Sequence, residues 1–384
     1  TTKGDYAYES APNSTDLTWE TVITKNIGLD LGFLNNRLNV SFDTYIRDTK
    51  DMLMAGKTLP GVYGAASPRM NVADLRTKGW EASITWGDHF TLASKPFNYR
   101  IMAGIGDNTS KVTKYDNPNR TLTDPYEGQQ LGEIWGYVVD GYFKTDEEAK
   151  NYKVNQSFVN QMINASALDN GLHAGDLKFV DLDGNNKIEQ TTSADDRKDM
   201  KVIGNSLPRY NYNFGISADW YGIDFSVLFQ GIGKQNWYPG TESSMFWGPY
   251  TRPYASFIPS DFMSQVWSEE NTDAYFPRPR GYVALNNNRE LAVVNNKYLQ
   301  NLAYCRLKNL SIGYTLPDKW LSKIGFEKIR IYFSGENLLT FTKLHSDYID
   351  PEQASASNSW KTSRSDASIY PWSKTYSFGV DITF

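Results

Sequence analysis

The stretch TYSFGVDITF, residues 375–384, alternates polar and apolar side chains along its whole length. Its apolar members are Tyr376, Phe378, Val380, Ile382 and Phe384, and the residues between them are small or polar. Successive side chains of a β-strand point to opposite faces of the sheet. The pattern therefore predicts a strand with one apolar face and one polar face. Most soluble domains close on a frayed polar tail, whereas this sequence closes on a regular strand.

The same alternation recurs in eight earlier segments. They are residues 23–33, 38–48, 80–86, 99–105, 210–220, 223–229, 310–316 and 329–341. Strands of soluble proteins usually have about 5 or 6 residues, whereas a tilted strand that crosses a membrane needs roughly 9–11. Several of the segments reach the longer value. The sequence therefore predicts nine strands of membrane-spanning length, and Lys25 is the one exception in the apolar row of the first.

The connections between these strands alternate between short and long. The short ones are 33–38, 88–96 and 221–222, with a moderate one at 317–327, and the long ones are 50–76, 109–208, 235–301 and 343–373. Transmembrane β-barrels have short periplasmic turns and long external loops. We therefore expect an all-β, antiparallel transmembrane barrel section whose C-terminus lies in the periplasm. A soluble β-sandwich or propeller stays open as an alternative, because half-buried sheets also alternate.

Composition fits this class without proving it. The 384 residues include 39 basic and 44 acidic side chains, a balance that does not indicate nucleic-acid binding. Mean hydropathy is −0.54, and no apolar run approaches the ~20 residues of a membrane helix. A barrel keeps its apolar side chains at every second position, so its average stays polar. Cys305 is the only cysteine, which excludes an internal disulfide.

The segment DLDGNNKIE, residues 181–189, carries oxygen donors at alternate positions, as a calcium-binding loop does. Asp181, Asp183 and Asn185 stand at positions 1, 3 and 5, the Lys187 carbonyl at position 7 and Glu189 at position 9. Asn186 replaces the usual glycine at position 6, and Asn tolerates the left-handed conformation. Position 12 is Thr192, which cannot supply the usual bidentate carboxylate. The segment is therefore either a structural Ca²⁺ loop or an ion-free polar turn.

The long loops hold clustered aromatic residues that could stack on sugars. The candidates are Trp135, Tyr137, Trp237, Trp247 and Tyr250. The alternative is that these rings pack between loops or against a partner protein. No serine-nucleophile, zinc-protease or phosphate-loop motif occurs. Carboxylate pairs such as Asp195 and Asp196 lack surroundings that would separate their pKa values, so we expect no catalytic residues and no enzyme activity.

Five stretches together resemble the C-terminal part of the SusC/RagA family of TonB-dependent outer-membrane transporters. They are residues 17–53, 175–189 (GDLKFVDLDGNNKIE), 266–278 (VWSEENTDAYFPR), 305–343 and the final strand. Their order and spacing are also similar to those of the family. The resemblance extends over nearly all of residues 1–384, and 235–265 is the least similar part.

The resemblance implies a chain that forms about the last nine strands of a 22-stranded barrel. The family's N-terminal extension, TonB-contact segment and plug have no counterpart in this sequence. In the family pattern the metal loop ends on Asp before Arg, which Asp196 and Arg197 match here. Any Ca²⁺ would be structural.

The function implied is TonB-dependent nutrient import across the outer membrane of a Bacteroidota-type bacterium. Lipid would cover the apolar face, and a SusD-like surface lipoprotein would cap the external loops and capture an oligosaccharide or a peptide. TonB would supply energy, and two transporter–lipoprotein units would pair. The alternative is a soluble or surface-anchored glycan-binding β-domain without transport. The sequence does not decide between glycan and peptide.

Overall fold

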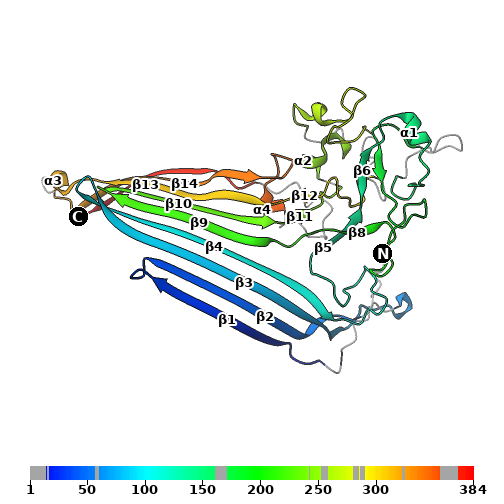
Figure 1. The fold of residues 1–384 in the computed structure, drawn as a ribbon, viewed down its shortest axis with the longest axis horizontal. Coiled ribbons are helices and arrows are strands. Elements are labelled where there is room, and N and C mark those ends of the chain that lie inside the picture. Colours follow the sequence, from blue (N-terminus) through cyan, green and yellow to red (C-terminus); the bar gives the residue numbers. More distant parts are fainter. Residues whose placement is uncertain are drawn as a thin grey trace, which may run out of the picture.

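The computed structural model describes residues 14, 17–56, 60–160, 171–241, 243–251, 258–279, 285, 290–321, 325–354 and 371–384. Nine long strands form one antiparallel sheet in the order β1-β2-β3-β4-β9-β10-β13-β14-β15 (Figure 1). Their bounds are β1 Thr21–Phe33, β2 Leu38–Ala55, β3 Arg69–Leu92, β4 Lys95–Lys114, β9 Arg209–Trp220, β10 Ile223–Lys234, β13 Tyr304–Thr315, β14 Lys328–Thr342 and β15 Thr375–Thr383. The nine expected strands are confirmed. Within the described residues the sheet is open, with β1 and β15 as its edges.

Several strands are longer than the alternation indicated. β2 continues to Ala55 and β3 begins at Arg69, so the loop expected at 50–76 shortens to residues 56–68. β4 likewise continues to Lys114, into the insertion expected from residue 109. Charged side chains interrupt the apolar rows near the loop-side ends of β2, β3 and β4, while the backbone pairing of these strands continues beyond them. Hydrophobic alternation therefore marks the apolar band and not the full strand.

The turns at the other end are tight. Asn35 and Asn36 have positive φ values of 58° and 62°, as the Asn-Asn sequence predicts. The connection expected at 88–96 is only a two-residue turn, Ala93-Ser94, with φ values of 47° and 61°. Neither alanine nor serine usually adopts positive φ, so a turn this short was not predictable from these two residues.

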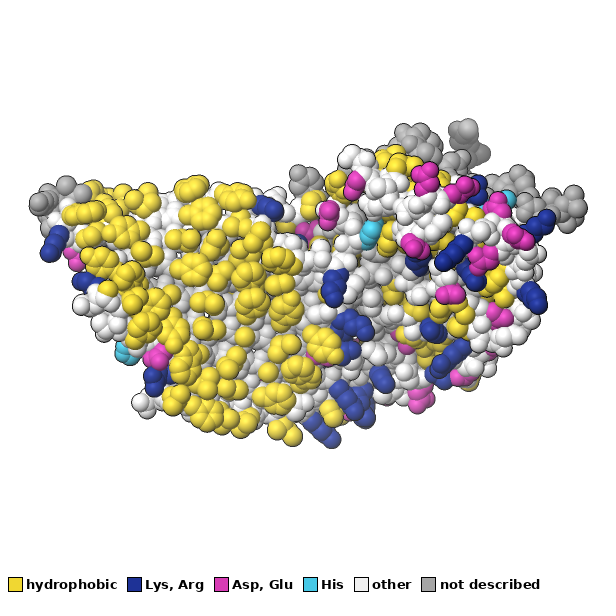
Figure 2. All heavy atoms as spheres, turned by 45° about the horizontal axis from the view of Figure 1, so that its top comes forward, with side chains coloured by type: hydrophobic (Ala, Val, Ile, Leu, Met, Phe, Trp, Pro, Cys, Tyr) yellow, Lys and Arg dark blue, Asp and Glu magenta, His cyan; other side chains and the backbone are white. Residues whose placement is uncertain are grey.

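One face of the sheet is apolar and uncovered within the described residues, as Figure 2 shows. On β15, Phe378 is 83% exposed and Val380 is 56% exposed. These two residues face Phe333 and Ile331 across the strand pair. The opposite face is polar, and one of its rows runs across five strands. This row consists of Ser217, Ser226, Ser311, Ser334 and Ser377. The two faces therefore suit two different surroundings.

On the polar face, two tyrosine rings lie across the backbone of the next strand. Tyr45 of β2 is opposite Gly79 of β3, and Tyr332 of β14 is opposite Gly379 of β15. A Cβ atom built on either glycine would overlap the tyrosine ring. Each ring therefore occupies the space that a side chain on the facing residue would need.

The long connections fold together at one end of the sheet, while α3 (Asp318–Leu321) and the C-terminus lie at the other (Figure 1). Short elements build this loop assembly: η1 Gly61–Tyr63, β5 Glu133–Tyr137, β6 Val139–Tyr142, α1 Asp146–Lys150, β7 Leu177–Phe179, β8 Met200–Asn205, β11 Asn236–Trp237, α2 Ser244–Trp247, η2 Gly248–Tyr250, η3 Phe262–Gln265, β12 Gln300–Asn301 and α4 Pro351–Ala354. The pairs β5–β8, β6–β7 and β11–β12 each form a two-stranded sheet. Among the described helices, none has both the length and the apolarity to cross a membrane.

Candidate functional site

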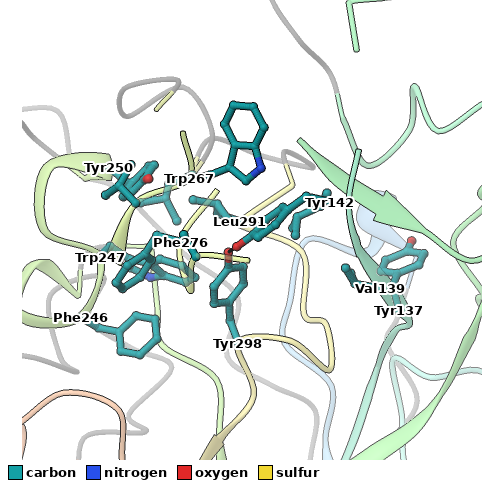
Figure 3. Packing of buried hydrophobic residues seen from close by; sticks show 14 of the residues in the cluster. Tyr137, Val139, Tyr142, Phe246, Trp247, Tyr250, Trp267, Phe276, Leu291 and Tyr298 are labelled. Atoms are coloured by element: carbon teal, nitrogen blue, oxygen red, sulfur yellow. Dashed lines mark hydrogen bonds between the residues drawn. The ribbon is translucent and has the colours of Figure 1, made fainter. Parts of the chain in front are cut away.

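The loop assembly has its own hydrophobic core, which draws on the connections after β4, β10 and β14. Aromatic rings dominate it (Figure 3). Trp247 packs edge-on against Tyr298, with ring centroids 5.1 Å apart, and Phe262 stacks on Phe276 at 4.9 Å. The hydroxyls of Tyr142 and Tyr298 lie 2.9 Å apart, although 156 positions separate them in sequence. Three separate loops are thus held as one packed unit.

Most of the aromatic residues expected to stack on sugars belong to this core. Tyr137, Trp237, Trp247 and Tyr250 are each at most 3% exposed. The Trp247 indole N–H donates to the Gly240 carbonyl at 3.0 Å. Burial raises the pKa of the Tyr250 hydroxyl, which donates to the Pro277 carbonyl at 2.5 Å. A sugar cannot stack on buried rings, so the expectation is corrected: these four side chains pack the loops.

Trp135 differs from the other four candidates because it is only half-buried. Its indole N–H donates to the Glu133 carboxylate at 2.9 Å. The Tyr126 hydroxyl also donates to Glu133. Burial and the Glu133 carboxylate together raise the pKa of Tyr126 to about 12. Of the five predicted rings, Trp135 is the one that is not fully buried.

The acidic loop brings three carboxylates together. Oxygen atoms of Asp181, Asp183 and Asp199 all lie within 4.8 Å of one another. The backbone N–H groups of Gly184 and Asn186 each donate to Asp181 at 2.7 Å. Asn186 has a φ of 60°, the left-handed conformation expected at this position. The loop is thus curled around its first aspartate as a calcium loop would be.

Asp199 is the member of this group that sequence reasoning missed. It lies immediately before β8, and its side chain is fully buried. The N–H groups of Leu182 and Glu189 donate to its two oxygens at 2.8 and 2.7 Å. Burial raises the pKa of Asp199, and the charges of Asp183 and Asp181 add to this effect against the two backbone donors. No loop spacing points to a residue this far along the chain.

Two other expected ligands lie outside the three-carboxylate group. The Glu189 carboxylate accepts from Lys187 Nζ at 2.9 Å and from Asn185 Nδ2 at 3.2 Å. Asp196 contributes a hydrogen bond to the loop through its backbone carbonyl, which accepts from the Thr191 hydroxyl. The Asn185 side-chain oxygen accepts the Lys187 N–H at 2.8 Å. Of the expected carboxylates, the structure thus brings together Asp181 and Asp183, and it adds Asp199 to them.

Three carboxylates in one small space fit a hard divalent cation. Calcium takes six to eight oxygen ligands, including carboxylates and backbone carbonyls. Ile188, within the loop, is fully buried in the hydrophobic core of the loop assembly, as an anchoring residue should be. The loop thus has suitable donors and a fixed position, although its coordination set needs more oxygens than these three aspartates provide.

The polar face of the sheet carries a second arrangement of charges, on β13. Arg306 is 2% exposed and binds Asp350 and Glu352, which flank the start of α4. Lys308 Nζ contacts both oxygens of Glu352, at 2.9 and 2.8 Å. These ion pairs fasten the segment after β14 to the polar face of the sheet.

Farther along the polar face lies an open hollow of about 370 Å³ over β2, β3, β4 and β9. Carboxylates and amides line it, among them Asp43, Glu81, Asn108, Asn211 and Asn213. Such a lining suits water and polar solutes, in contrast to the apolar face behind it. The polar positions that alternate with the apolar ones in the sequence thus form one face of the sheet.

Comparisons with known proteins agree on one family. The model of the family "TonB dependent receptor-like, beta-barrel" matches residues 2–338. The TonB-dependent receptor P3 of Formosa agariphila is 28% identical over 388 residues, which cover 96% of this chain and 34% of the relative. The TonB-dependent receptor SusC of Bacteroides thetaiotaomicron is 24% identical over 375 residues, covering 96% of this chain and 32% of SusC.

Solved structures show the same fold. The RagAB peptide importer in its "open-open" state matches with a TM-score of 0.63 and 21% identity, covering 96% of this chain and 35% of that one. A structure of the RagAB peptide transporter matches with a TM-score of 0.63 and 20% identity, covering 97% and 36%. The chain thus spans about a third of the length of the proteins it matches.

Proposed function

Because the chain belongs to the TonB-dependent receptor-like β-barrel family, a family of outer-membrane proteins, we propose that it forms part of the wall and the external loops of a nutrient importer. The observation that carries this proposal is the bare apolar face of the nine-stranded sheet. In lipid every backbone polar group needs an internal partner, which a closed barrel of paired strands provides. The proposal therefore extends to the 22-stranded barrel, in which β1 and β15 pair with strands outside this sheet.

A soluble glycan-binding β-domain is the less favoured reading. Soluble proteins rarely expose an apolar patch larger than a few hundred Å². Here Ile27, Ile216 and Phe378, on three different strands, are 76%, 43% and 83% exposed on the same face. A soluble domain would have to cover this face with another layer.

The orientation follows from the two ends of the sheet. Tight turns lie at one end with α3 and the C-terminus, and the loop assembly lies at the other (Figure 1). Outer-membrane barrels keep short turns in the periplasm and long loops outside. We place the C-terminus in the periplasm on this basis.

The cargo would be an oligosaccharide or a peptide. Two matched structures are named as a peptide importer and a peptide transporter, and one relative is named SusC. The clustered aromatic residues of the loops favoured a sugar cargo, but most of them are buried, so they no longer support it. The packed loop assembly would form the platform for a SusD-like lipoprotein, with TonB supplying energy and two such units pairing. Nucleic acid has no part in the proposal, and neither does catalysis.

The acidic loop would hold one structural Ca²⁺. Asp181, Asp183 and Asp199 would supply carboxylate oxygens, and Asn185 and the Lys187 carbonyl lie in the same loop. Glu189 is a weaker candidate, because Lys187 and Asn185 already bind it. The ion would fix the segment between β7 and β8 without acting on the cargo.

Cysteine labelling in intact cells tests the orientation and the membrane location together. The starting variant is Cys305→Ser, to which Lys201→Cys on β8 or Lys319→Cys on α3 is added; both lysines are exposed. A membrane-impermeant maleimide should label Lys201→Cys in intact cells and Lys319→Cys only after the outer membrane is opened. Equal labelling of both, or recovery of the protein without detergent in the soluble fraction, would contradict the proposal.

Binding of the cargo class needs its own test. The protein is purified in detergent from its host, and mixed oligosaccharides or mixed peptides are added at equal mass concentration. Co-purified ligand is then identified by mass spectrometry. Enrichment of either class over the other identifies the cargo, and enrichment of neither sinks the importer function while leaving the barrel assignment intact.

A further inference from the structure

The outer face of β1–β4 changes from apolar to basic at its loop-side border. The pairing register places Lys25, Ile46, Lys78 and Thr109 in one row across the four strands. The next row toward the loops holds Ile23, Asp48, Arg76 and Lys111. Lys50 lies in the following row toward the loops, two residues after Asp48 on β2 and opposite Thr21 on β1. Lys25, which interrupts the apolar row of β1, is thus one of several basic residues that lie close together on this face.

We name this group, Lys25, Lys50, Arg76, Lys78 and Lys111, the basic patch. Asp48 and Asp74 are its acidic neighbours, so the local net charge is +3. Asp48 is paired with Arg76 at 2.6 Å, and Asp74 accepts the Asp51 N–H at 2.9 Å. Across the described ranges of the chain, none of the four lysines forms an ion pair. The patch therefore carries uncompensated positive charge.

The position of the charge is as informative as its sign. Figure 2 shows dark blue side chains gathered between the yellow apolar face and the loop region, toward the bottom of the view. Trp80 lies one row nearer the apolar face, half-buried, and tryptophan favours the boundary between lipid and water. At the turn end of the same strands, Arg37 is instead paired with Asp88 at 3.0 Å. Four lysines without an ion pair to any described residue thus lie together at the loop-side border of β1–β4.

The spacing suits a small anion held by several lysines. Neighbouring strands lie about 4.8 Å apart, so Lys25 and Lys78, two strands apart in one row, have backbones roughly 10 Å apart. Lysine has a flexible stem that can lie along apolar surface while its ammonium reaches the headgroup level. Both ammonium groups can therefore reach one phosphate from opposite sides, and Lys111 stands diagonally across from Lys78.

We propose that the basic patch binds the phosphate groups of lipids in the leaflet beside the long loops. This inference rests on the proposed function, because lipid must cover the apolar face for headgroups to reach this height. Lysine binds phosphate as a point charge without a fixed geometry, which suits a lipid surface better than a shaped ligand pocket. Bound lipid would set the depth of β1–β4 in the membrane and order the adjoining loop side.

Lipid titration of the intact protein tests the inference. The protein is purified from its host in a zwitterionic detergent, and native mass spectrometry measures binding of lipid A, dephosphorylated lipid A and phosphatidylethanolamine. Inorganic phosphate at equal phosphorus concentration is a fourth arm. The variant is Lys25→Gln/Lys78→Gln/Lys111→Gln. The matched control is Lys201→Gln/Lys343→Gln/Lys374→Gln, which removes three exposed lysines elsewhere at the loop side.

Each lysine near an anionic surface contributes about fivefold to binding, so the triple variant should bind lipid A on the order of 100-fold more weakly. The control should bind as the parent does, and added salt should weaken binding to the parent. Dephosphorylated lipid A, phosphatidylethanolamine and free phosphate should bind weakly to all three proteins.

Two outcomes overturn the inference. Equal binding of lipid A by the triple variant and its control would remove the patch from the interaction, as expected if the lysines instead face an acidic partner protein. Free phosphate that binds as tightly as lipid A would make this an anion site unrelated to membrane lipid. Recovery of the parent protein in the outer-membrane fraction, with heat-dependent migration on a gel, keeps either result separate from failure of the proposed function.

Discussion

The guanidinium of Arg306 faces the carboxylate of Asp350, with Nη2 2.7 Å from each of its two oxygens. Arg306 also donates to Glu352 at 2.6 Å and to the Thr340 hydroxyl at 3.0 Å. These contacts join β13 to the segment that follows β14. A buried ion pair adds little net stability, but removal of one partner leaves the other charge buried and unpaired.

Replacement of Arg306 by Met should therefore loosen the segment after β14. We expect a loss of about 3 kcal/mol in the local opening free energy, because the Asp350 carboxylate would lose its arginine. Amide hydrogen exchange of residues 344–354 measures it. Arg37→Met, which removes the exposed pair with Asp88, is the control and should leave exchange nearly unchanged. Equal effects of the two variants would mean that Arg306 does not fasten this segment.

The two faces of β15 should respond differently to a new charge. Val380→Asp places a carboxylate on the apolar face and should cost on the order of 2 kcal/mol, and Ile382→Asp, nearer the end of the strand, should cost less. Ser377→Asp lies on the polar face, in the row of serines, and should be tolerated. The amount of heat-modifiable protein in outer-membrane fractions measures assembly. Equal tolerance at the two faces would contradict their assignment to lipid and water.

The acidic loop makes a prediction about metal dependence. Addition of Ca²⁺ should protect residues 175–200 from protease in the parent protein, and Asp199→Asn should abolish that protection because Asp199 lies in the three-carboxylate group. Asp196→Asn should keep it, since the structure finds Asp196 outside that group. Protection lost in Asp196→Asn and kept in Asp199→Asn would restore the set expected from loop spacing.

The stability of the acidic loop should fall as pH rises without calcium and should rise with pH when calcium is bound. The pKa of Asp199 is raised above its ordinary value of 3.8 by burial and by Asp183 and Asp181. In a metal chelator, its contribution to stability is therefore full below pH 3.8 and is lost as pH rises through the raised pKa. With Ca²⁺ present, deprotonation completes the site, and stability should rise with pH over that range. Protease resistance of residues 175–200, measured against pH with and without Ca²⁺, tests both signs.

Trp247 should matter for packing and not for ligand contact. Trp247→Ala removes a fully buried indole and should destabilise the loop core by about 3–5 kcal/mol. Hydrogen exchange should increase in residues 237–251 and 290–302, while the strands β1–β4 keep their protection. Trp19→Ala, at a residue 93% exposed, is the matched control. Loss of cargo binding with unchanged exchange would instead return Trp247 to the binding residues.

Local pattern was enough to predict the sheet, because Phe378 and Val380 reveal their common face within three residues of sequence. The limits of β2 and β3 were not predictable from that pattern, since the charges of the basic patch interrupt the apolar row while pairing continues. The Ala93-Ser94 turn was not predictable because both residues adopt positive φ, which alanine and serine rarely do.

The candidate sites depended on contacts between distant parts of the chain. Asp199 lies beside Asp181 in the fold although 18 positions separate them, and the calcium-loop spacing does not extend that far. The burial of Trp237 and Trp247 depends on three loops meeting, as the Tyr142–Tyr298 hydroxyl contact shows. An aromatic residue in a long loop can stack on a ligand or fill a core, and sequence alone does not distinguish these roles.

The two tyrosines that lie across glycines have a further consequence for the shape of the polar face. The Tyr45 ring lies along the sheet over Gly79, and the Tyr332 ring lies along it over Gly379. A tyrosine that stood upright would project away from the sheet, whereas these two rings cover the neighbouring strand instead. The polar face of the sheet thereby keeps a low relief at both places, and each ring forms an aromatic surface that bridges two strands.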